Sequence, residues 1–128
     1  MKLFITLIFT TISAFAFAQN STDCSQVKTG KFRLVSELSG TTIIKRTKKY
    51  QIEINEDADY KAKFDIVWKD DCTYELHNKK LIKGPEYLSG KAGNILIVEI
   101  LWVTEDRMRV KSSSNFAPMK VETEIEIL

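Results

Sequence analysis

The stretch that decides the fold is residues 60–69, which read YKAKFDIVWK. Apolar or aromatic residues occupy every second position from Tyr60 to Trp68, and charged residues occupy most of the positions between them. Strict alternation of this kind is typical of a β-strand with one buried and one solvated face. The segment therefore predicts a strand whose interior face carries Tyr60, Phe64 and Trp68.

The same period of two recurs along most of the chain. Turn-forming residues separate the alternating segments, and no stretch of ten or more residues shows a convincing helical period. In the segment that begins near residue 49, we expect Tyr50, Ile52 and Ile54 to be buried and Gln51 and Glu53 to face solvent. The expected strands are 31–37, 41–47, 49–55, 60–69, 72–80, 94–104, 107–112 and 119–127.

About eight strands with short connections predict an all-β, antiparallel meander. Closing the meander into a small lipocalin-like barrel would remove the exposed strand edges. A two-sheet β-sandwich needs the same alternation and stays open as an alternative. A barrel of eight strands is filled by its own side chains or holds one small ligand.

The first eighteen residues have the pattern of a targeting signal. Lys2 precedes an apolar run that ends in Ala16-Phe17-Ala18, a small-x-small cleavage site. We therefore expect a signal peptide at 1–18, a polar leader at 19–29 and a single β domain at 30–128. The protein would then be exported, to the periplasm or outside the cell. No other apolar run approaches the roughly 20 residues of a membrane-spanning helix.

Charge and cysteine content narrow the classes of function. The formal net charge is only +2, which argues against a nucleic-acid binder, because such proteins usually carry a strong basic excess. Cys24 and Cys72 are the only cysteines, and an exported chain would join them in a structural disulfide. With one histidine and no C-x-x-C pair they do not complete a zinc site, so we expect no metal and no cofactor.

Three polar residues are candidates for catalysis. His77 is the only histidine, and its place in the alternation, opposite to the apolar residues of its strand, predicts that it faces water. Asp70 and Asp71 could form an acid–base pair, but adjacent residues of a strand point to opposite faces. We therefore interpret these two as turn residues.

Two further charged segments are interpreted as surface features. Asn55, Asp57 and Asp59 have the spacing that begins a calcium loop, but the glycine and glutamate that the loop requires further on are absent. They are expected to form a polar hairpin turn. The basic run at residues 45–49, KRTKK, is expected to be a solvated hairpin.

The interior positions could line a ligand cavity or simply fill a small core. Tyr50 is expected among the interior aromatic residues. The side chains that would line a cavity or fill the core are Tyr60, Phe64, Trp68, Tyr74, Val98, Ile100 and Trp102.

Three functions are compatible with this pattern. The first is a binding or interaction module of the cell envelope, whose partner would be a small lipophilic molecule or an envelope protein. A carrier of a small lipophilic ligand is the sharper version, and it requires an interior cavity of about 300 Å³ or more. A small hydrolase is the third, and it requires Asp70, Asp71 or His77 to converge in a cleft.

Several motifs resemble those of a known group of proteins. Residues 24–32, CSQVKTGKF, and residues 67–76, VWKDDCTYEL, resemble a family of small uncharacterised secreted proteins of Bacteroidetes-type bacteria. The resemblance implies a signal peptide, a β-rich domain and paired cysteines, with no known activity. Some members bear the automatic name DNA topoisomerase IV, which this short chain without an ATP-binding motif does not fit. Gly30-Lys31-Phe32 also resembles the Gly-x-Trp that opens the first strand of lipocalin-like barrels.

Overall fold

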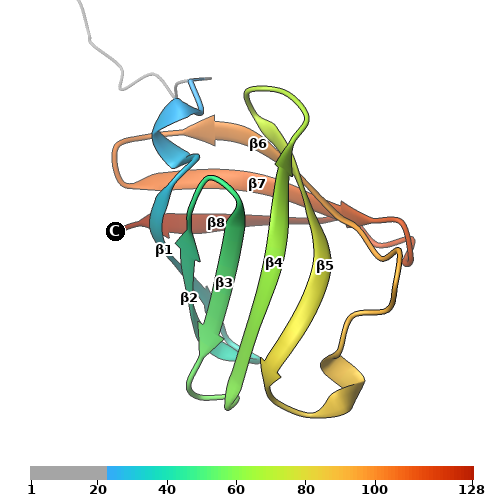
Figure 1. Cartoon of the computed structure of the whole chain (residues 1–128). Coiled ribbons are helices and arrows are strands. Elements are labelled where there is room, and N and C mark those ends of the chain that lie inside the picture. Colours follow the sequence, from blue (N-terminus) through green and yellow to red (C-terminus); the bar gives the residue numbers. More distant parts are fainter. Residues whose placement is uncertain (1–22) are drawn as a thin grey trace, which may run out of the picture.

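The computed structural model describes residues 23–128 (Figure 1). The expected signal peptide at 1–18 and residues 19–22 of the expected leader lie outside the described residues. Within residues 23–128, no helix has the length and hydropathy of a membrane span.

Eight antiparallel strands form a closed barrel in which each strand pairs with its neighbours in the sequence and β8 pairs with β1. The predicted all-β meander is confirmed, and closure decides in favour of the barrel over the two-sheet sandwich. The strands are β1 (Gly30–Ser36), β2 (Gly40–Arg46), β3 (Tyr50–Asn55), β4 (Tyr60–Trp68), β5 (Thr73–Lys83), β6 (Leu96–Val103), β7 (Arg107–Ser114) and β8 (Val121–Ile127).

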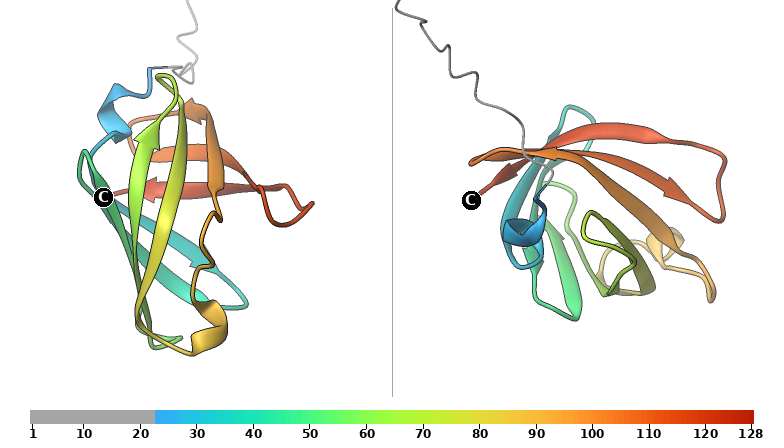
Figure 2. Two further views of the ribbon diagram at one scale, coloured as in Figure 1. Left: turned by 45° about the vertical axis from the view of Figure 1, so that its right-hand side comes forward. Right: turned by 90° about the horizontal axis from the view of Figure 1, so that it is seen from above.

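The wall of the barrel is not uniform. Strands β2 to β5 stand side by side, and β6 to β8 cross them at a steep inclination (Figures 1 and 2). β5 pairs with β4 along most of its length, but with β6 only from Thr73 to Leu76. Residues 84–95, which include the short 3-10 helix η2 (Glu86–Leu88), connect the two strands beyond that point. Hydrogen bonds therefore hold β5 to β6 over only a short stretch.

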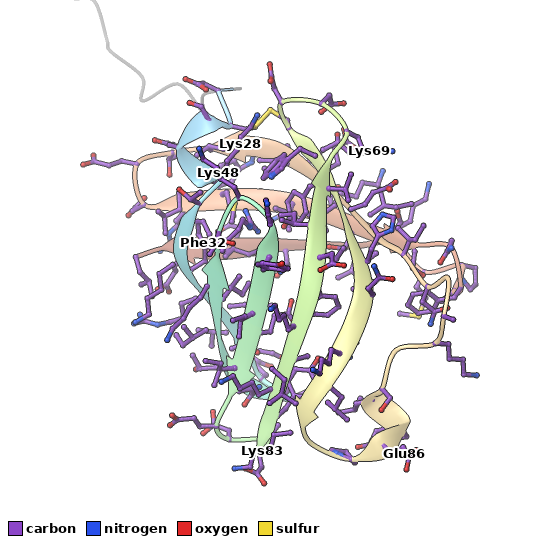
Figure 3. All side chains as sticks on the ribbon, viewed as in Figure 1. Lys28, Phe32, Lys48, Lys69, Lys83 and Glu86 are labelled. Carbon is purple, nitrogen blue, oxygen red and sulfur yellow. A yellow bond between two sulfur atoms is a disulfide. The ribbon has the colours of Figure 1, made fainter. Side chains whose placement is uncertain are left out.

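A second short 3-10 helix, η1 (Ser25–Val27), covers one end of the barrel. Cys24 and Val27 are buried, so this part of the expected leader packs on the domain. The expected disulfide between Cys24 and Cys72 is confirmed, with 5.4 Å between the two Cα atoms. It ties η1 to the β4–β5 turn, and Figure 3 shows it at the end opposite to Lys83 and Glu86.

Strand β3 turns the opposite face inward from the one that we expected. Tyr50 is 40% exposed, whereas Gln51 and Asn55 are buried, and Glu53 points inward with them. The cause lies in the tight β2–β3 hairpin, where Arg46 pairs directly with Gln51. Directly paired residues share a face of the sheet, so the inward Arg46 carries Gln51 inside and leaves the apolar residues of β3 outside.

A β-bulge in β6 changes the position of Trp102. Ile100 pairs with Val110 and Trp102 with Arg109, so Leu101 is an extra residue in the ladder. An extra residue reverses the alternation beyond it. Val103 is therefore completely buried, and Trp102 lies on the outer face, which corrects its expected place in the interior.

Another bulge occurs in β5 at Asn78, which has a positive φ of 51°. His77 pairs with Asp65 and Lys80 with Lys63, so two residues of β5 lie opposite the single residue Phe64. Beyond the bulge the alternation is reversed, and Lys79 points into the barrel above the ring of Phe64.

Candidate ligand-binding site

A buried arginine organises the end of the barrel beneath η1. Arg46 is 3% exposed. Its Nε donates to Oε1 of Gln51 at 3.0 Å, and its two terminal nitrogens donate to the Val27 carbonyl at 2.7 Å and to the Tyr74 hydroxyl at 2.8 Å. The predicted solvated hairpin at 45–49 is therefore wrong for Arg46, while the other four residues of the run are exposed.

Aromatic rings surround the Arg46 guanidinium. Its carbon lies 4.5 Å from the ring centre of Tyr74, 4.8 Å from that of Phe32 and 5.9 Å from that of Trp68. Ring faces attract a cation, and they do so more strongly where water is excluded. Burial raises the pKa of Tyr74 against the opposing effect of Arg46, so its hydroxyl stays neutral. The Arg46 guanidinium is thus enclosed and hydrogen-bonded by the protein itself.

The middle of the barrel contains a pocket of about 120 Å³, to which every strand except β4 contributes. Most of the wall is apolar, and its polar groups lie on β3, β5, β7 and β8. The apolar side chains are Leu34, Ile44, Leu76, Leu96, Val98, Val110 and Ile125; the polar ones are Gln51, Glu53, Tyr74, Ser112 and Thr123. A cavity of this size has room for about four water-sized groups, since a water molecule occupies ~30 Å³ in the liquid.

Glu53 is the charged residue in the wall of this pocket. Within the described residues its carboxylate has one hydrogen bond, from Nε2 of Gln51 to Oε1 at 3.1 Å. Burial raises the pKa of Glu53, and the Gln51 hydrogen bond, Lys79 and Arg46 oppose this effect. A carboxylate usually accepts several hydrogen bonds, so Glu53 retains acceptor capacity toward the pocket.

A second hollow lies beside η2. This hollow has a volume of about 200 Å³ and shares Leu96 with the interior pocket. Its wall includes Tyr87 and Phe116, which are 83% and 55% exposed. We call this hollow the mouth. The mouth therefore offers an exposed aromatic surface next to the apolar interior.

Lys79 stands between the mouth and the polar part of the interior. Its Nζ lies 5.1 Å from the ring centre of Tyr60 and 5.8 Å from that of Phe64. Partial burial lowers the pKa of Lys79, and the nearby Glu53 opposes this effect. Burial also raises the pKa of Tyr60, with a further contribution from Glu53. Lys79 and Tyr60 are therefore both close enough to Glu53 to be affected by its charge.

The residues that were expected to line a cavity or fill the core, apart from Trp102, are divided between the pocket and the core. Only Tyr74 and Val98 of that set line the interior pocket. Phe64 and Ile100 are buried in the core, and Trp68 packs partly buried against it near Arg46. Tyr60 also packs against the core, beneath Lys79.

The candidate catalytic residues are not brought into one cleft. Asp70 accepts a hydrogen bond from the Cys72 backbone at 2.9 Å, and the side chain of Asp71 is 98% exposed beside Lys28. Both lie in the β4–β5 turn. His77 is on the outer face of β5, where its ring lies 2.9 Å from Oε1 of Glu75.

The segment that was compared with a calcium loop is a structural turn. The Asn55 side-chain oxygen accepts from the Ala58 backbone at 3.0 Å, and Asp57 accepts from the Thr41 backbone at 3.1 Å. Asp59 pairs with Lys83 at 2.6 Å. In residues 23–128, no group of three or more histidine, cysteine, aspartate or glutamate side chains is placed to hold a metal ion.

Sequence reasoning missed Arg46, Gln51 and Glu53 as interior residues. The signal that could have found them was the hairpin itself, since residues 46 and 51 flank the turn at matching positions. Comparison of the chain with protein-family models, with curated proteins and with solved structures finds no match.

Proposed function

We propose that the protein is an exported binding module that holds one small amphipathic molecule in the pocket and mouth of its barrel. The observation that carries this proposal is Glu53, a charged side chain in the wall of an otherwise largely apolar pocket. A buried carboxylate lowers the stability of the fold unless hydrogen-bond donors or an opposite charge compensate for its lost hydration. A ligand that donates a hydrogen bond to Glu53 and packs its apolar part against the apolar side chains of the wall would match both the charged and the apolar lining.

The dimensions limit the ligand to a small one. The interior pocket alone is well below the ~300 Å³ that a typical small-molecule site needs, and the pocket and the mouth together reach about that limit. A ligand with a short chain of about six carbons therefore fits better than a long-chain lipid. Its polar end would lie at Glu53 and its chain would extend past Leu96 to Tyr87 and Phe116.

Two further features support a binding role outside the cytoplasm. The Cys24–Cys72 disulfide is of the kind that persists in oxidising compartments. The separation of Asp70 and Asp71 from the outward-facing His77 favours binding over hydrolysis. Together with the predicted signal peptide, these observations favour a module of the cell envelope.

The test is a titration of the protein, with its disulfide intact, followed by amide chemical shifts in NMR spectra. The probes are 1-hexanol and hexylamine, which can donate a hydrogen bond to Glu53, and hexanoate, which cannot when it is ionised. We expect saturable shifts at Glu53, Val98 and Val110 with both donors. Hexanoate should bind at least about tenfold more weakly, because a ligand that leaves a buried polar group unpaired loses affinity.

A matched pair of variants locates the site. Ser112 lines the pocket, whereas Ser113 is its neighbour on the outer face of β7. Ser112→Phe should fill the pocket and abolish the shifts, and Ser113→Phe should leave them unchanged. Absence of binding by all three probes, or equal binding by both variants, would refute the proposal.

A further inference from the structure

The outer face of β1, β2 and β3 carries a second hollow, of about 450 Å³, on the side of the sheet that faces away from the pocket. The row across its middle is apolar, because Ile43 of β2 pairs directly with Ile54 of β3 and both are partly exposed. These side chains are outside because the β2–β3 hairpin turned the polar face of β3 inward. We call this hollow the outer groove.

The charged residues of the outer groove are separated by sign. Lys31 and Lys45 pair with each other across β1 and β2, on the side of the apolar row nearer to η1. Glu56 and Asp57 lie on the other side of the row, in the β3–β4 turn. Within residues 23–128, none of these four side chains takes part in an ion pair. The outer groove therefore presents unpaired positive charge at one end and unpaired negative charge at the other.

We propose that the outer groove is the contact surface of a two-fold symmetric dimer with a second copy of this chain. A two-fold axis in the interface, along the row of Ile43 and Ile54, would place each apolar row against its own copy. The same rotation exchanges the two ends of the groove, so that the basic end of one copy meets the acidic end of the other. A two-fold dimer requires self-complementarity of this kind.

The register of the strands makes the match specific. In β2, Lys45 and Thr41 are each two residues from Ile43, in opposite directions, and Asp57 is bonded to the Thr41 backbone. The axis therefore brings Lys45 of one copy opposite Asp57 of the other. In β3, Ile52 and Glu56 are likewise each two residues from Ile54. Since Ile52 is flanked by Lys45 and Lys63, Glu56 of one copy would meet these two lysines of the other.

Exposed apolar side chains extend the surface beyond the groove. Val35 is 61% exposed on β1, and Tyr50 is 40% exposed on β3. An apolar centre with a charged rim is the usual anatomy of a protein interface. A face of three short strands is at the small end of the size range for stable interfaces, so we expect a dissociation constant in the micromolar range.

Sedimentation velocity over about 1 to 300 μM protein tests the proposal, because this range brackets micromolar association. The wild-type protein should change from monomer to dimer across the series. Lys45→Glu and Glu56→Lys should each weaken association at least about tenfold, because like charges would then face each other. Lys91→Glu, an equal charge change at an exposed loop position, is the control and should associate as the wild type does.

Mixing the two charge variants should restore association. In a heterodimer of the Lys45→Glu and Glu56→Lys variants, the two substituted positions attract each other, and the second variant's Lys45 meets Glu56 and Asp57 of the first. The equimolar mixture should therefore associate more strongly than either variant alone. Thermal melts establish that each variant is folded. A wild-type monomer at the highest concentration, or a mixture of folded variants that associates no more strongly than each variant alone, overturns the proposal.

Discussion

The charged interior groups at the two ends of the barrel differ in how many hydrogen bonds they make. Beneath η1, the Arg46 guanidinium donates to three acceptors that belong to the protein itself, and aromatic rings enclose it. Toward the mouth, Glu53 has a single hydrogen bond in the described part of the chain and faces an open pocket. At the η1 end the Arg46 guanidinium is partnered by the protein itself, although within residues 23–128 the buried Nε1 of Trp68 has no hydrogen-bond partner. At the mouth end, the Glu53 carboxylate has unused capacity to accept hydrogen bonds.

This difference indicates which end stabilises the fold and which end is available for binding. A buried polar network stabilises a structure when its members are partnered, and a partly satisfied group lowers stability. We therefore expect substitutions at the η1 end to cost stability. Substitutions at Glu53 should leave stability intact or increase it.

Loss of Arg46 should have the largest effect. Arg46→Met keeps the bulk of the side chain but leaves Gln51, the Tyr74 hydroxyl and the buried Val27 carbonyl without their donors. Each buried group left unpaired costs roughly 1–3 kcal/mol, so we expect a loss of about 5 kcal/mol. Urea denaturation measures it, with Lys45→Met on the outer face as a control. Equal midpoints for the two variants would show that Arg46 does not organise this end.

Removal of the disulfide should have the next largest effect on stability. Cys24→Ser combined with Cys72→Ser opens a loop that spans 48 residues of sequence. The chain-entropy relation gives a loss of about 4 kcal/mol for a loop of this length. Thermal melts of the double variant and of the oxidised wild type measure the loss. A melting temperature unchanged by the double substitution would exclude a stabilising role for the cross-link.

Trp68 tests the packing of the η1 end. Its ring lies 4.9 Å from that of Tyr74 and packs partly buried against the core. Trp68→Ala should cost about 3 kcal/mol, the low end for loss of a large aromatic side chain. Val67 is 41% exposed on the outer face, so Val67→Thr should cost less than ~0.5 kcal/mol. If Val67→Thr were the more damaging change, the assignment of inner and outer faces in β4 would be wrong.

Glu53 should give the smallest effect, with the opposite sign. Burial raises the folded-state pKa of Glu53 above its ordinary value of 4.5. Its contribution to stability is therefore greatest when it is protonated, below pH 4.5, and is lost as the pH rises through the folded-state pKa. Glu53→Gln imitates the protonated form, and Arg46 and Lys79 are retained in both proteins.

The measurement is the difference in melting temperature between the Glu53→Gln variant and the wild type, from pH 4 to pH 8 without ligand. The variant should become increasingly more stable than the wild type as the pH rises. Glu99→Gln, at an exposed position of β6, should show no such trend. A difference that is constant with pH, or that favours the wild type at high pH, would mean that the Glu53 carboxylate is already satisfied at the mouth end.

Predictability differed from strand to strand for identifiable reasons. In β4 the expected face is correct, since Ala62, Phe64 and Ile66 are buried. In β6 it is correct only as far as Ile100, because a bulge beyond that residue leaves no signature in the local alternation. In β3 the period is right and the face is wrong. Gln51 and Glu53 were not predicted as pocket residues, because their inward position follows from this reversal.

The sequence by itself determined the period of two, the number of strands, the meander and the pairing of Cys24 with Cys72. Those properties depend on residues close in the chain or on a unique pair of cysteines. Only the tertiary structure decided which face of β3, and of β6 beyond its bulge, points inward, and therefore where Glu53 and the apolar outer groove lie. The physical reason is that hydrogen-bonded pairing fixes the face of a strand jointly with its neighbours. In a closed barrel, a hairpin such as that between Arg46 and Gln51 can override the hydrophobicity of a single strand.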